Sequence, residues 1–337
     1  MDNEEMNSKL LSVSVAAYNM EDYIEQCLDS CLCGEMMNRL EVLIVDDGSS
    51  DSTAALAQSY VERYPGTFRL LSKPNGGYGS TVNLSMEEAT GKYFRLLDAD
   101  DWFGKGSLQK LISLLDDCEA DAIITPMYRC VEGKEPCLVD DSFGIEPEKV
   151  VPVGALPDTC YISMWRLSIK TELLQKDRFE LPEHCVFTDQ LYVANCICRS
   201  ETIIFFDVPL YEYRIGRDGQ SVAPESRIAH KKELEFVTSE ELSLFEGLQR
   251  DDKKQALLGT VAAHYSTYLK LLLMLPRSRR NFNEIRRWEK RLHLASTELY
   301  KAAGFRKLTR ILRNSHYLAY WPLTLLDLRQ KKYWEPK

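Results

Sequence analysis

The first 125 residues alternate short apolar runs with segments of helical periodicity, and this alternation restricts the fold more than any other feature. Short runs of bulky apolar residues fit buried strands, and the segments between them space apolar residues three and four apart, as amphipathic helices do. Strands and helices that alternate in this way predict an α/β fold, a mostly parallel sheet with helices on both faces. The predicted strands are 12–17, 41–45, 68–71, 92–97 and 121–125, and the predicted helices are 21–33, 52–63, 80–89 and 107–118.

Acidic residues follow two of these strands directly. Asp46 and Asp47 follow the second strand, and Asp98, Asp100 and Asp101 follow the fourth. In open α/β sheets ligands bind at this carboxyl edge, and carboxylates are the hard ligands that Mg²⁺ or Mn²⁺ prefers. Acidic turns are also common as solvated loops and helix caps, so the residues alone leave both interpretations open.

Composition narrows the class of protein. With 337 residues, 45% of them hydrophobic and 28% charged, the chain is long enough for one large globular domain and a smaller one. The net charge of -9 argues against a nucleic-acid partner. Cys27 and Cys31 lie on the apolar face of a predicted helix, which favours core packing over metal binding. The N-terminus has no apolar signal segment, so a cytoplasmic location is predicted.

The regular alternation ends at Pro126, and two domains are predicted. Residues 10–222 form the first, in which 165–175 and 188–198 are predicted helices, 203–206 is a short strand and 211–214 leads into a polar loop. Residues 223–337 form a helical C-terminal domain or extension. Its most apolar segment, 256–275, includes His264 and Lys270, so it is predicted to be a packed helix rather than a membrane span.

Two familiar loop types do not fit. A calcium loop of the EF-hand type needs a carboxylate at its twelfth position, which is Ala57 counting from Asp46 and Gln109 counting from Asp98. A dinucleotide fingerprint needs a third glycine where Val82 stands after Gly77-x-Gly79. These mismatches exclude an EF-hand calcium loop at both places. They also remove the main sequence evidence for hydride transfer with a dinucleotide.

Four motifs in order resemble those of family 2 glycosyltransferases. They are Val13–Asn19, Val45–Thr53, Asn75-Gly76-Gly77 with Asn83, and Leu97–Asp101. The resemblance covers about residues 10–222 and implies a GT-A fold that transfers a sugar, with inversion, from a nucleotide diphosphate sugar. One departure is Ala16, which stands where the family usually has proline.

The resemblance implies roles for individual residues. Tyr18 would stack on the base of a UDP-sugar, Asp46 or Asp47 would accept a hydrogen bond from the uracil N3–H, and Asp98 and Asp100 would bind a divalent cation, Mn²⁺ or Mg²⁺. Asp101 would support the two cation ligands without binding the cation itself. The full set of implied donor-binding residues is Ala17, Tyr18, Asp46, Asp47, Lys73, Asn75, Gly76, Asn83, Asp98, Ala99 and Arg214.

The acceptor hydroxyl needs a base, and the resemblance assigns this role to Asp189. In the family a carboxylate at the start of a helix takes the proton, and Thr188-Asp189 occupies the matching position. Two alternatives are an N-cap role for Asp189, since Asp is a favoured cap, and Glu183 as the base. The segment Tyr213–Ser221 resembles a late loop that faces the diphosphate or the acceptor, although its Arg and Tyr residues also fit a structural edge.

The predicted function is an inverting, metal-dependent and non-processive hexosyl- or N-acetylhexosaminyltransferase. A Gln-x-x-Arg-Trp motif beside membrane spans marks processive members, and Arg286-Arg287-Trp288 lacks the glutamine. The rivals are a nucleotidyltransferase acting on sugar phosphates, which normally carries a glycine-rich basic loop where Ala17–Asn19 stand, and a GT-A binding module without turnover.

The resemblance implies an acceptor in surface glycan synthesis, a saccharide or a lipid-linked saccharide. The C-terminal residues add a possible membrane partner, because basic side chains alternate there with apolar and aromatic ones. A helix of this kind also packs well against an acidic domain, so the alternative is a folded tail. The residues concerned are Phe305, Arg306, Lys307, Leu308, Arg310, Ile311, Leu312, Arg313, Tyr317, Tyr320 and Trp321.

Overall fold

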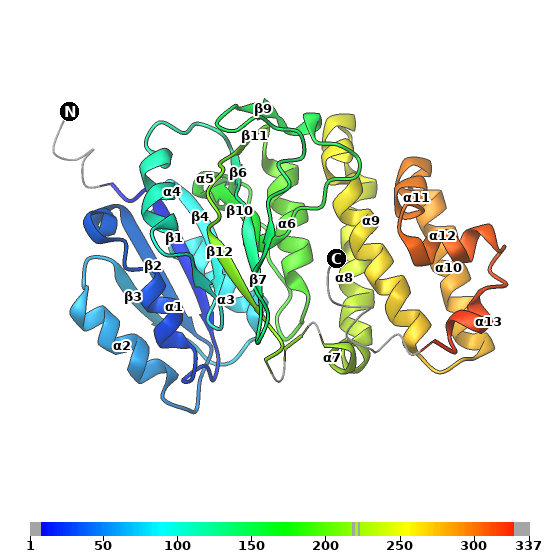
Figure 1. The fold of residues 1–337 in the computed structure, drawn as a ribbon, viewed down its shortest axis with the longest axis horizontal. Coiled ribbons are helices and arrows are strands. Elements are labelled where there is room, and N and C mark those ends of the chain that lie inside the picture. Colours follow the sequence, from blue (N-terminus) through cyan, green and yellow to red (C-terminus); the bar gives the residue numbers. More distant parts are fainter. Residues whose placement is uncertain (1–7, 218–219, 222, 327–337) are drawn as a thin grey trace. The chain divides into compact units, whose positions relative to one another are not determined.

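The computed structural model describes residues 8–217, 220–221 and 223–326. The chain divides into two compact units, each with its own set of internal contacts. The first contains residues 1–153 and 162–217, and the second contains residues 154–161 and 218–337. In the described residues, the first unit combines sheets with helices, whereas the regular elements of the second are helices (Figure 1). The sequence prediction placed a single boundary after residue 222, and it did not anticipate that 154–161 would group with the helical unit.

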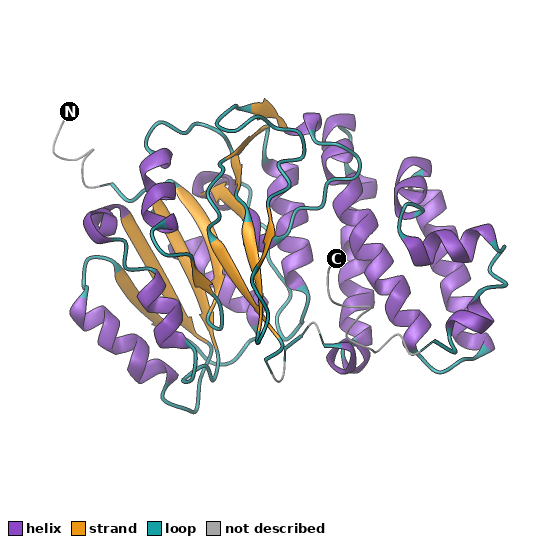
Figure 2. Cartoon of the chain, viewed as in Figure 1, coloured by secondary structure: helices purple, strands orange, loops and turns teal. Residues whose placement is uncertain are grey.

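The larger sheet of the first unit is mixed but begins with four parallel strands (Figure 2). Its order is β3-β2-β1-β4-β10-β6-β11-β9, and β10 is antiparallel to both of its neighbours. The predicted α/β fold is therefore confirmed. The strands are β1 (Leu11–Ala17), β2 (Leu40–Asp46), β3 (Phe68–Ser72), β4 (Tyr93–Asp98), β6 (Ala122–Ile124), β9 (Val151–Pro152), β10 (Leu167–Lys170) and β11 (Thr202–Phe205).

Successive side chains of the central strands point to opposite faces of this sheet. Val13 and Val15 of β1 join a core cluster on one face, together with side chains of the helices that cover it. Ser14, between them, points to the other face and donates a hydrogen bond to Ser85 Oγ at 2.7 Å. This period of two is what a strand covered on both faces requires.

The helices of the first unit are those that the alternation predicts, with shifted ends. Cys27 and Cys31 are fully buried in the core, as predicted. The predicted helix 21–33 is shorter, because a separate 3-10 helix, η2 (Gly34–Arg39), begins at Gly34, whose φ is 60°. The helices are α1 (Ile24–Ser30), α2 (Thr53–Arg63), α3 (Tyr78–Glu88), α4 (Ser107–Leu115), α5 (Thr171–Lys176) and α6 (Thr188–Arg199), with short 3-10 turns η3 (Val153–Ala155) and η4 (Met164–Arg166).

The predicted helix 165–175 is wrong in its first half, where Leu167–Lys170 form strand β10. Ser168 pairs with Arg95 of β4 on one side and with Ile123 of β6 on the other. The Arg95 guanidinium donates to Ser168 Oγ at 2.9 Å and to Thr125 Oγ1 at 3.2 Å. Pairing between two strands therefore overrides a local pattern that favours helix.

A second, four-stranded sheet lies in the same unit and has the order β5-β12-β7-β8. Its longest pairing is the parallel one between β12 and β7, which runs from Tyr211 opposite Met127 to Ile215 opposite Val131. The segment that follows the fourth predicted strand thus continues into this sheet through β5. The strands are β5 (Trp102–Phe103), β7 (Met127–Val131), β8 (Cys137–Val139) and β12 (Tyr211–Ile215).

The helical unit is organised around a buried carboxylate. Glu289 accepts hydrogen bonds from the hydroxyls of Tyr265 (2.7 Å) and Tyr317 (2.8 Å) and from Nε of Arg313 (2.7 Å). No helix in the described part of the chain is both long enough and apolar enough to cross a membrane. The helices are α7 (Pro224–Ala229), α8 (Lys231–Gly247), α9 (Asp251–Met274), α10 (Arg279–Ala295), α11 (Thr297–Ala303), α12 (Lys307–Asn314) and α13 (Tyr320–Leu323).

The close approach of Gly91 to β1 gives a test of this packing. A β-carbon at Gly91 would lie 2.5 Å from the Ser12 amide nitrogen and 2.7 Å from the Leu11 carbonyl carbon, so Gly91→Ala should lower the free energy of unfolding by about 1–3 kcal/mol. Gly66→Ala is the control, because no atom lies within 4 Å of that position. Urea midpoints followed by circular dichroism measure both, and equal midpoints would contradict the close approach.

Candidate active site

The parallel register brings the ends of the predicted motifs to one edge of the larger sheet. Ala17 pairs with Asp46 of β2, and Asp46 pairs with Ser72 of β3. On the other side of β1, Ala16 pairs with Asp98 of β4. The loops that follow these four strands therefore leave the sheet next to one another, at the edge where ligands bind in open α/β sheets.

Asp47 holds the loop between β3 and α3 in place. Its carboxylate accepts hydrogen bonds from the backbone amides of Gly76 (2.9 Å) and Gly77 (2.8 Å) and from the Lys73 ammonium group (2.6 Å). Lys73 also donates to Ser80 Oγ at 2.7 Å. Gly77 has a φ of 81°, which disfavours any side chain there. Three predicted donor-binding residues, Asp47, Lys73 and Gly76, are thus joined in one network.

Tyr18 lies beside this network and remains 47% exposed. The Ala17 carbonyl accepts a hydrogen bond from the Asp47 amide at 2.9 Å, and the Asn75 side chain donates to the Asp47 carbonyl at 3.1 Å. Asp46 is buried, and its Oδ1 accepts a hydrogen bond from the amide three residues further on, at 3.2 Å. An exposed aromatic ring therefore stands next to two ordered turns.

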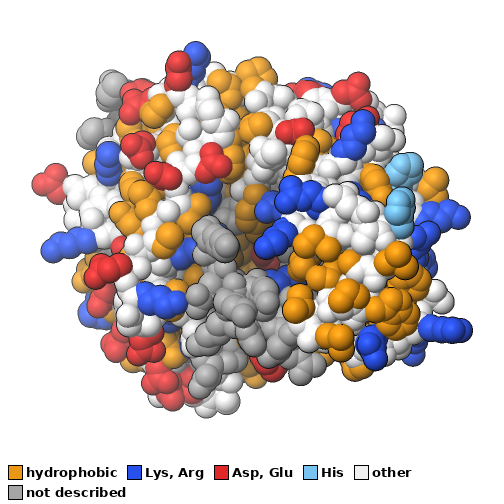
Figure 3. Space-filling view, turned by 45° about the vertical axis from the view of Figure 1, so that its right-hand side comes forward, with side chains coloured by type: hydrophobic (Ala, Val, Ile, Leu, Met, Phe, Trp, Pro, Cys, Tyr) orange, Lys and Arg blue, Asp and Glu red, His pale blue; other side chains and the backbone are white. Residues whose placement is uncertain are grey.

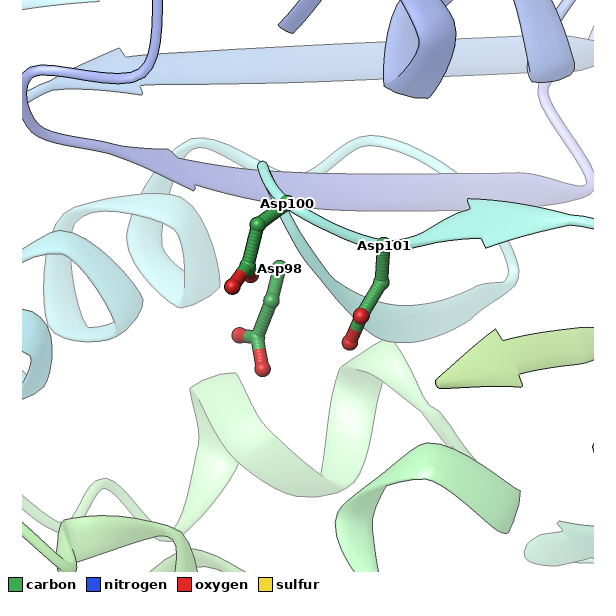
Figure 4. A group of neighbouring side chains, drawn as sticks. All are labelled: Asp98, Asp100 and Asp101. Carbon is green, nitrogen blue, oxygen red and sulfur yellow. The ribbon is translucent and has the colours of Figure 1, made fainter. Parts of the chain in front are cut away.

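Three carboxylates gather where β4 ends. Asp98, Asp100 and Asp101 each offer an oxygen within 4.8 Å of the others, and their side chains leave the strand end on the same side (Figure 4). Ala99, between them, is buried. The predicted cation ligands Asp98 and Asp100 thus lie together, and the third acid adds to the negative charge.

The electrostatics of Asp98 reflect this crowding. Burial, together with the charges of Asp100 and Asp189, raises the pKa of Asp98 to about 7, and this net value includes a partial offset from the Tyr78 hydroxyl and the Trp165 indole. Its Oδ1 has no hydrogen-bond partner among the described residues. A carboxyl in these surroundings is stabilised as an anion by any positive charge placed beside it.

Asp101 is held from the second sheet. Burial raises the pKa of its carboxyl above the usual range, with contributions from Asp98 and Asp100. The carboxylate accepts hydrogen bonds from the Tyr211 hydroxyl at 2.6 Å and from the Arg214 amide at 2.7 Å. Both of its oxygens therefore already have donors, and its predicted supporting role stays a prediction.

Arg214 lies against the same corner through its side chain. Its Nε donates to the Asp100 carbonyl at 2.8 Å, and its Nη2 donates to Gln26 Oε1 at 2.6 Å. The guanidinium also stacks over the rings of Trp102 and Tyr23, 4.7 and 5.1 Å from their centroids. Arg214 therefore links β12 to α1 and to the acidic loop, and it places a fixed positive charge near the carboxylates.

Asp189 reaches the same region from α6. It lies in the first turn of that helix, and its charge raises the pKa of both Asp98 and Tyr78. The N-cap position itself belongs to Phe187, whose own side chain makes no capping hydrogen bond. The alternative role of Asp189 as the N-cap residue is therefore not the one that the helix adopts, and the carboxylate lies close to the acidic cluster.

Asn83 has its side chain engaged within the protein. Its Nδ2 donates to the Leu181 carbonyl and its Oδ1 accepts from the Leu181 amide, both at 2.9 Å. The side chain thus ties α3 to the segment that leads into α6. Its contacts suit the positioning of that segment better than direct contact with a ligand.

The chemistry of the acidic corner fits a divalent cation. Mg²⁺ and Mn²⁺ favour oxygen ligands, and the three carboxylates offer only oxygens. The unpaired buried Oδ1 of Asp98 is a further sign, because a buried acceptor without a donor is costly unless something positive completes it. Asp98 and Asp100 are thus suited to hold the cation, with Asp101 behind them.

Comparisons with known proteins agree with this geometry. The model of the family described as glycosyl transferase family 2 matches residues 12–180, which is half of the chain. The chain belongs to glycosyl transferase family 2. Among curated members, the uncharacterized glycosyltransferase EpsJ of Bacillus subtilis (strain 168) is 26% identical over 211 residues, which are 61% of this chain and 61% of EpsJ. The chain therefore matches less than two thirds of the length of that relative.

Solved structures show that this family 2 chain has the GT-A fold. The crystal structure of S. aureus TarS 1–349 with UDP-GlcNAc has a TM-score of 0.70 at 20% identity, covering 94% of this chain and 90% of that one. The mannosyltransferase PcManGT of Pyrobaculum calidifontis, in complex with GDP-Man and Mn²⁺, has a TM-score of 0.53 at 16% identity, with coverages of 95% and 87%. At these identities the likeness concerns the fold alone.

The sequence motifs of this family 2 member did not point to the aromatic residues Trp165 and Tyr211, which lie beside the acidic cluster. Trp165 of η4 stacks on Tyr213 of β12, with ring centroids 4.1 Å apart, and Tyr211 holds Asp101. Neither Trp165 nor Tyr211 belongs to the motifs that carry the resemblance. Tyr211 and Tyr213 are two residues apart, which is the spacing that places side chains on the same face of a strand. This spacing is the one sequence signal that could have indicated both rings.

Proposed function

We propose that this chain transfers a sugar from a UDP-sugar to an acceptor hydroxyl, with inversion at the anomeric carbon and one transfer per encounter. The observation that carries the proposal is the parallel register that brings the strand ends of the motifs to one sheet edge, where Asp98 and Asp100 cluster, with Asp189 in the first turn of α6. Inverting transfer needs a base on one side of the sugar and charge stabilisation on the other. These side chains supply both kinds of group.

In the proposed reaction Asp189 takes the proton from the acceptor hydroxyl. The acceptor oxygen then attacks the anomeric carbon from the face opposite the nucleotide, the bond to the diphosphate breaks, and the configuration inverts. A divalent cation held by Asp98 and Asp100 would supply Lewis-acid stabilisation of the departing diphosphate. The fixed charge of Arg214 lies on the same side and adds to that stabilisation.

The nucleotide would lie along the turns after β1 and β2. We assign base stacking to Tyr18, because its ring is 47% exposed beside these turns. Asp46, or its neighbour Asp47, would accept from the uracil N3–H, and the loop of Lys73, Asn75 and Gly76 would adjoin the donor. The complex of TarS with UDP-GlcNAc supports the choice of a UDP-sugar of the hexosyl or N-acetylhexosaminyl class.

Two rival functions make different predictions for nucleotide release. A nucleotidyltransferase would release pyrophosphate from a nucleoside triphosphate, and a binding module would release nothing. The discriminating experiment incubates the full chain with a panel of UDP- and GDP-sugars and Mn²⁺, with and without saccharide acceptors, and measures free nucleoside diphosphate. Acceptor-dependent release of UDP supports the proposal, and its absence with every donor and acceptor would count against it.

Asp189→Asn tests the assignment of the base. Turnover should fall by roughly 10² to 10⁴, with donor affinity little changed, because an amide cannot take the proton. Glu183→Gln, at the nearest competing acid, is the matched control and should retain activity. Steady-state kinetics and isothermal titration with the donor measure the two effects. Equal losses of turnover and donor binding in Asp189→Asn would indicate a structural role instead.

Asp100→Asn tests metal dependence. Mn²⁺-dependent turnover should fall roughly a hundredfold or more, because one hard ligand is lost, while the far-ultraviolet circular dichroism stays unchanged. Asp117→Asn, an exposed acid after α4, is the control. Activity of Asp100→Asn equal to that of the unchanged chain, or full activity of the unchanged chain in excess EDTA, would contradict the assignment.

We propose as well that residues 10–222 form the catalytic domain and that the C-terminal residues 223–337 bring it to the cytoplasmic face of the membrane. Residues 276–326 contain 12 Lys and Arg against 3 Asp and Glu, although the whole chain has a net charge of -9. Positive segments of this kind attract anionic headgroups. Such contact would suit a lipid-linked saccharide acceptor in surface glycan synthesis.

The helical unit also exposes large apolar side chains next to this charge. Part of the predicted membrane face is packed inward instead, since Leu312 and Tyr320 are buried and Arg313 bonds to Glu289. Hydrophobic side chains and Lys or Arg side chains lie beside one another on the right-hand part of the face in Figure 3. The exposed large apolar residues of the segment 276–326 are Leu294, Phe305, Ile311, Leu318, Trp321, Leu325 and Leu326.

Membrane contact is tested with two variants of the full chain. Phe305→Ser with Leu318→Ser, and separately Arg306→Glu with Arg310→Glu, should each reduce co-sedimentation with phosphatidylglycerol-containing vesicles at low salt. Phe236→Ser, an exposed aromatic residue of α8 in the same unit, is the control and should leave binding unchanged. Negligible binding by the unchanged chain would remove the membrane proposal.

A further inference from the structure

The cation ligand Asp100 already has a positive partner in this structure. Nε of Arg217 donates to Asp100 Oδ2 at 2.7 Å, and the guanidinium lies 5.5 Å from the centre of the Tyr23 ring. Both members of this ion pair are largely shielded, with 19% of the Arg217 side chain and 12% of the Asp100 side chain exposed. The guanidinium therefore occupies a carboxylate oxygen in the group best suited to hold a divalent ion.

Two arginines approach this corner, one from strand β12 and one from the residues that follow it. Arg214 belongs to strand β12, donates to a backbone carbonyl and to Gln26, and stacks on two rings. Arg217 comes after the strand has ended. Gly216, just before it, has a φ of 107°, and no atom lies within 4 Å of the place where its β-carbon would be. An uncrowded glycine, Gly216, thus lies in the backbone between Arg214 and Arg217.

We infer that Arg217 is a latch on the cation site, which must leave Asp100 before a divalent cation can bind and which couples cation binding to donor binding. This inference rests on the proposed function. A guanidinium and a divalent cation repel each other, so the arginine that holds Asp100 Oδ2 at 2.7 Å opposes the binding of a cation to the same carboxylate. The diphosphate of the donor offers the released guanidinium a new anionic partner.

The affinity for Mn²⁺ should therefore depend on whether UDP is bound, and the affinity for UDP on whether Mn²⁺ is bound. When a site is open only part of the time, the apparent affinity of a ligand is reduced by the open fraction. UDP, which draws Arg217 away from Asp100, raises that fraction and so tightens Mn²⁺ binding. By linkage, Mn²⁺ tightens UDP binding by the same factor. Arg217 is thus a positioning residue that delays cation loading until the donor is present.

A purely structural ion pair would behave differently. Removal of a structural partner would loosen the acidic corner and weaken Mn²⁺ binding, or leave it unchanged. Removal of a competitor strengthens it. The sign of the change in Mn²⁺ affinity without nucleotide therefore separates the two roles, and it does so without any measurement of sugar transfer.

The experiment titrates the full chain with MnCl₂ and follows free Mn²⁺ by electron paramagnetic resonance, with and without UDP. Arg217→Ala should bind Mn²⁺ roughly threefold to tenfold more tightly than the unchanged chain when UDP is absent, which is the range expected for loss of a partly shielded ion pair. The factor by which UDP tightens Mn²⁺ binding should be smaller in this variant. Arg217→Lys, which keeps the charge, should lie between the two, and Arg63→Ala, on α2, is the control.

Each outcome decides the inference. Tighter Mn²⁺ binding by Arg217→Ala without UDP supports the latch, even if no donor sugar is ever transferred. Equal or weaker binding would overturn it, and so would the absence of Mn²⁺ binding by both proteins. An unchanged effect of UDP in the variant would overturn the coupling. Failure of the proposed sugar transfer would appear separately, as a lack of UDP release in the donor panel.

Discussion

The site depends on the pairing of β1 with β2 on one side and with β4 on the other. This pairing aligns Ala17 with Asp46, and Ala16 with Asp98, so that three motifs far apart in the sequence end at one level. At the opposite end of the same strands, Ser12 donates to the buried Glu41 carboxylate at 2.5 Å, and Arg69 donates to it at 2.9 Å. A buried carboxylate needs such partners, so polar contacts at the far end help to set the register.

Much of the first sheet could be predicted from the sequence, because its strands are apolar runs and its helices have apolar faces. Periodicity is a local property, and it identified β1, β2, β3 and β4 with ends shifted by at most one residue. It failed at Leu167–Lys170, where the local pattern favours helix and the strand exists because β4 and β6 leave a place between them. Partners from distant segments decide such a case, and a single sequence does not name them.

The candidate site, like the sheet, could be predicted from the sequence only in part. The motifs indicated which residues lie at the edge, since that follows from where strands end. They did not indicate that Asn83 bonds to Leu181, that Tyr211 holds Asp101, or that Arg217 pairs with Asp100. These contacts join residues about 100 or more positions apart, so they depend on the folded chain. The roles of the carboxylates themselves rest on kinetic and binding tests.

The placement of β10 has a consequence for how the chain folds. Strand β4 ends at Asp98, but the strand that covers its free edge begins at Leu167. During synthesis β4 would thus be an unpaired edge, bearing the buried residues Tyr93 and Phe94, until about seventy further residues have emerged. Exposed edges of this kind attract other chains, and distant pairings form slowly. Incomplete chains that stop before β10 are therefore expected to aggregate through this edge more readily than the complete chain.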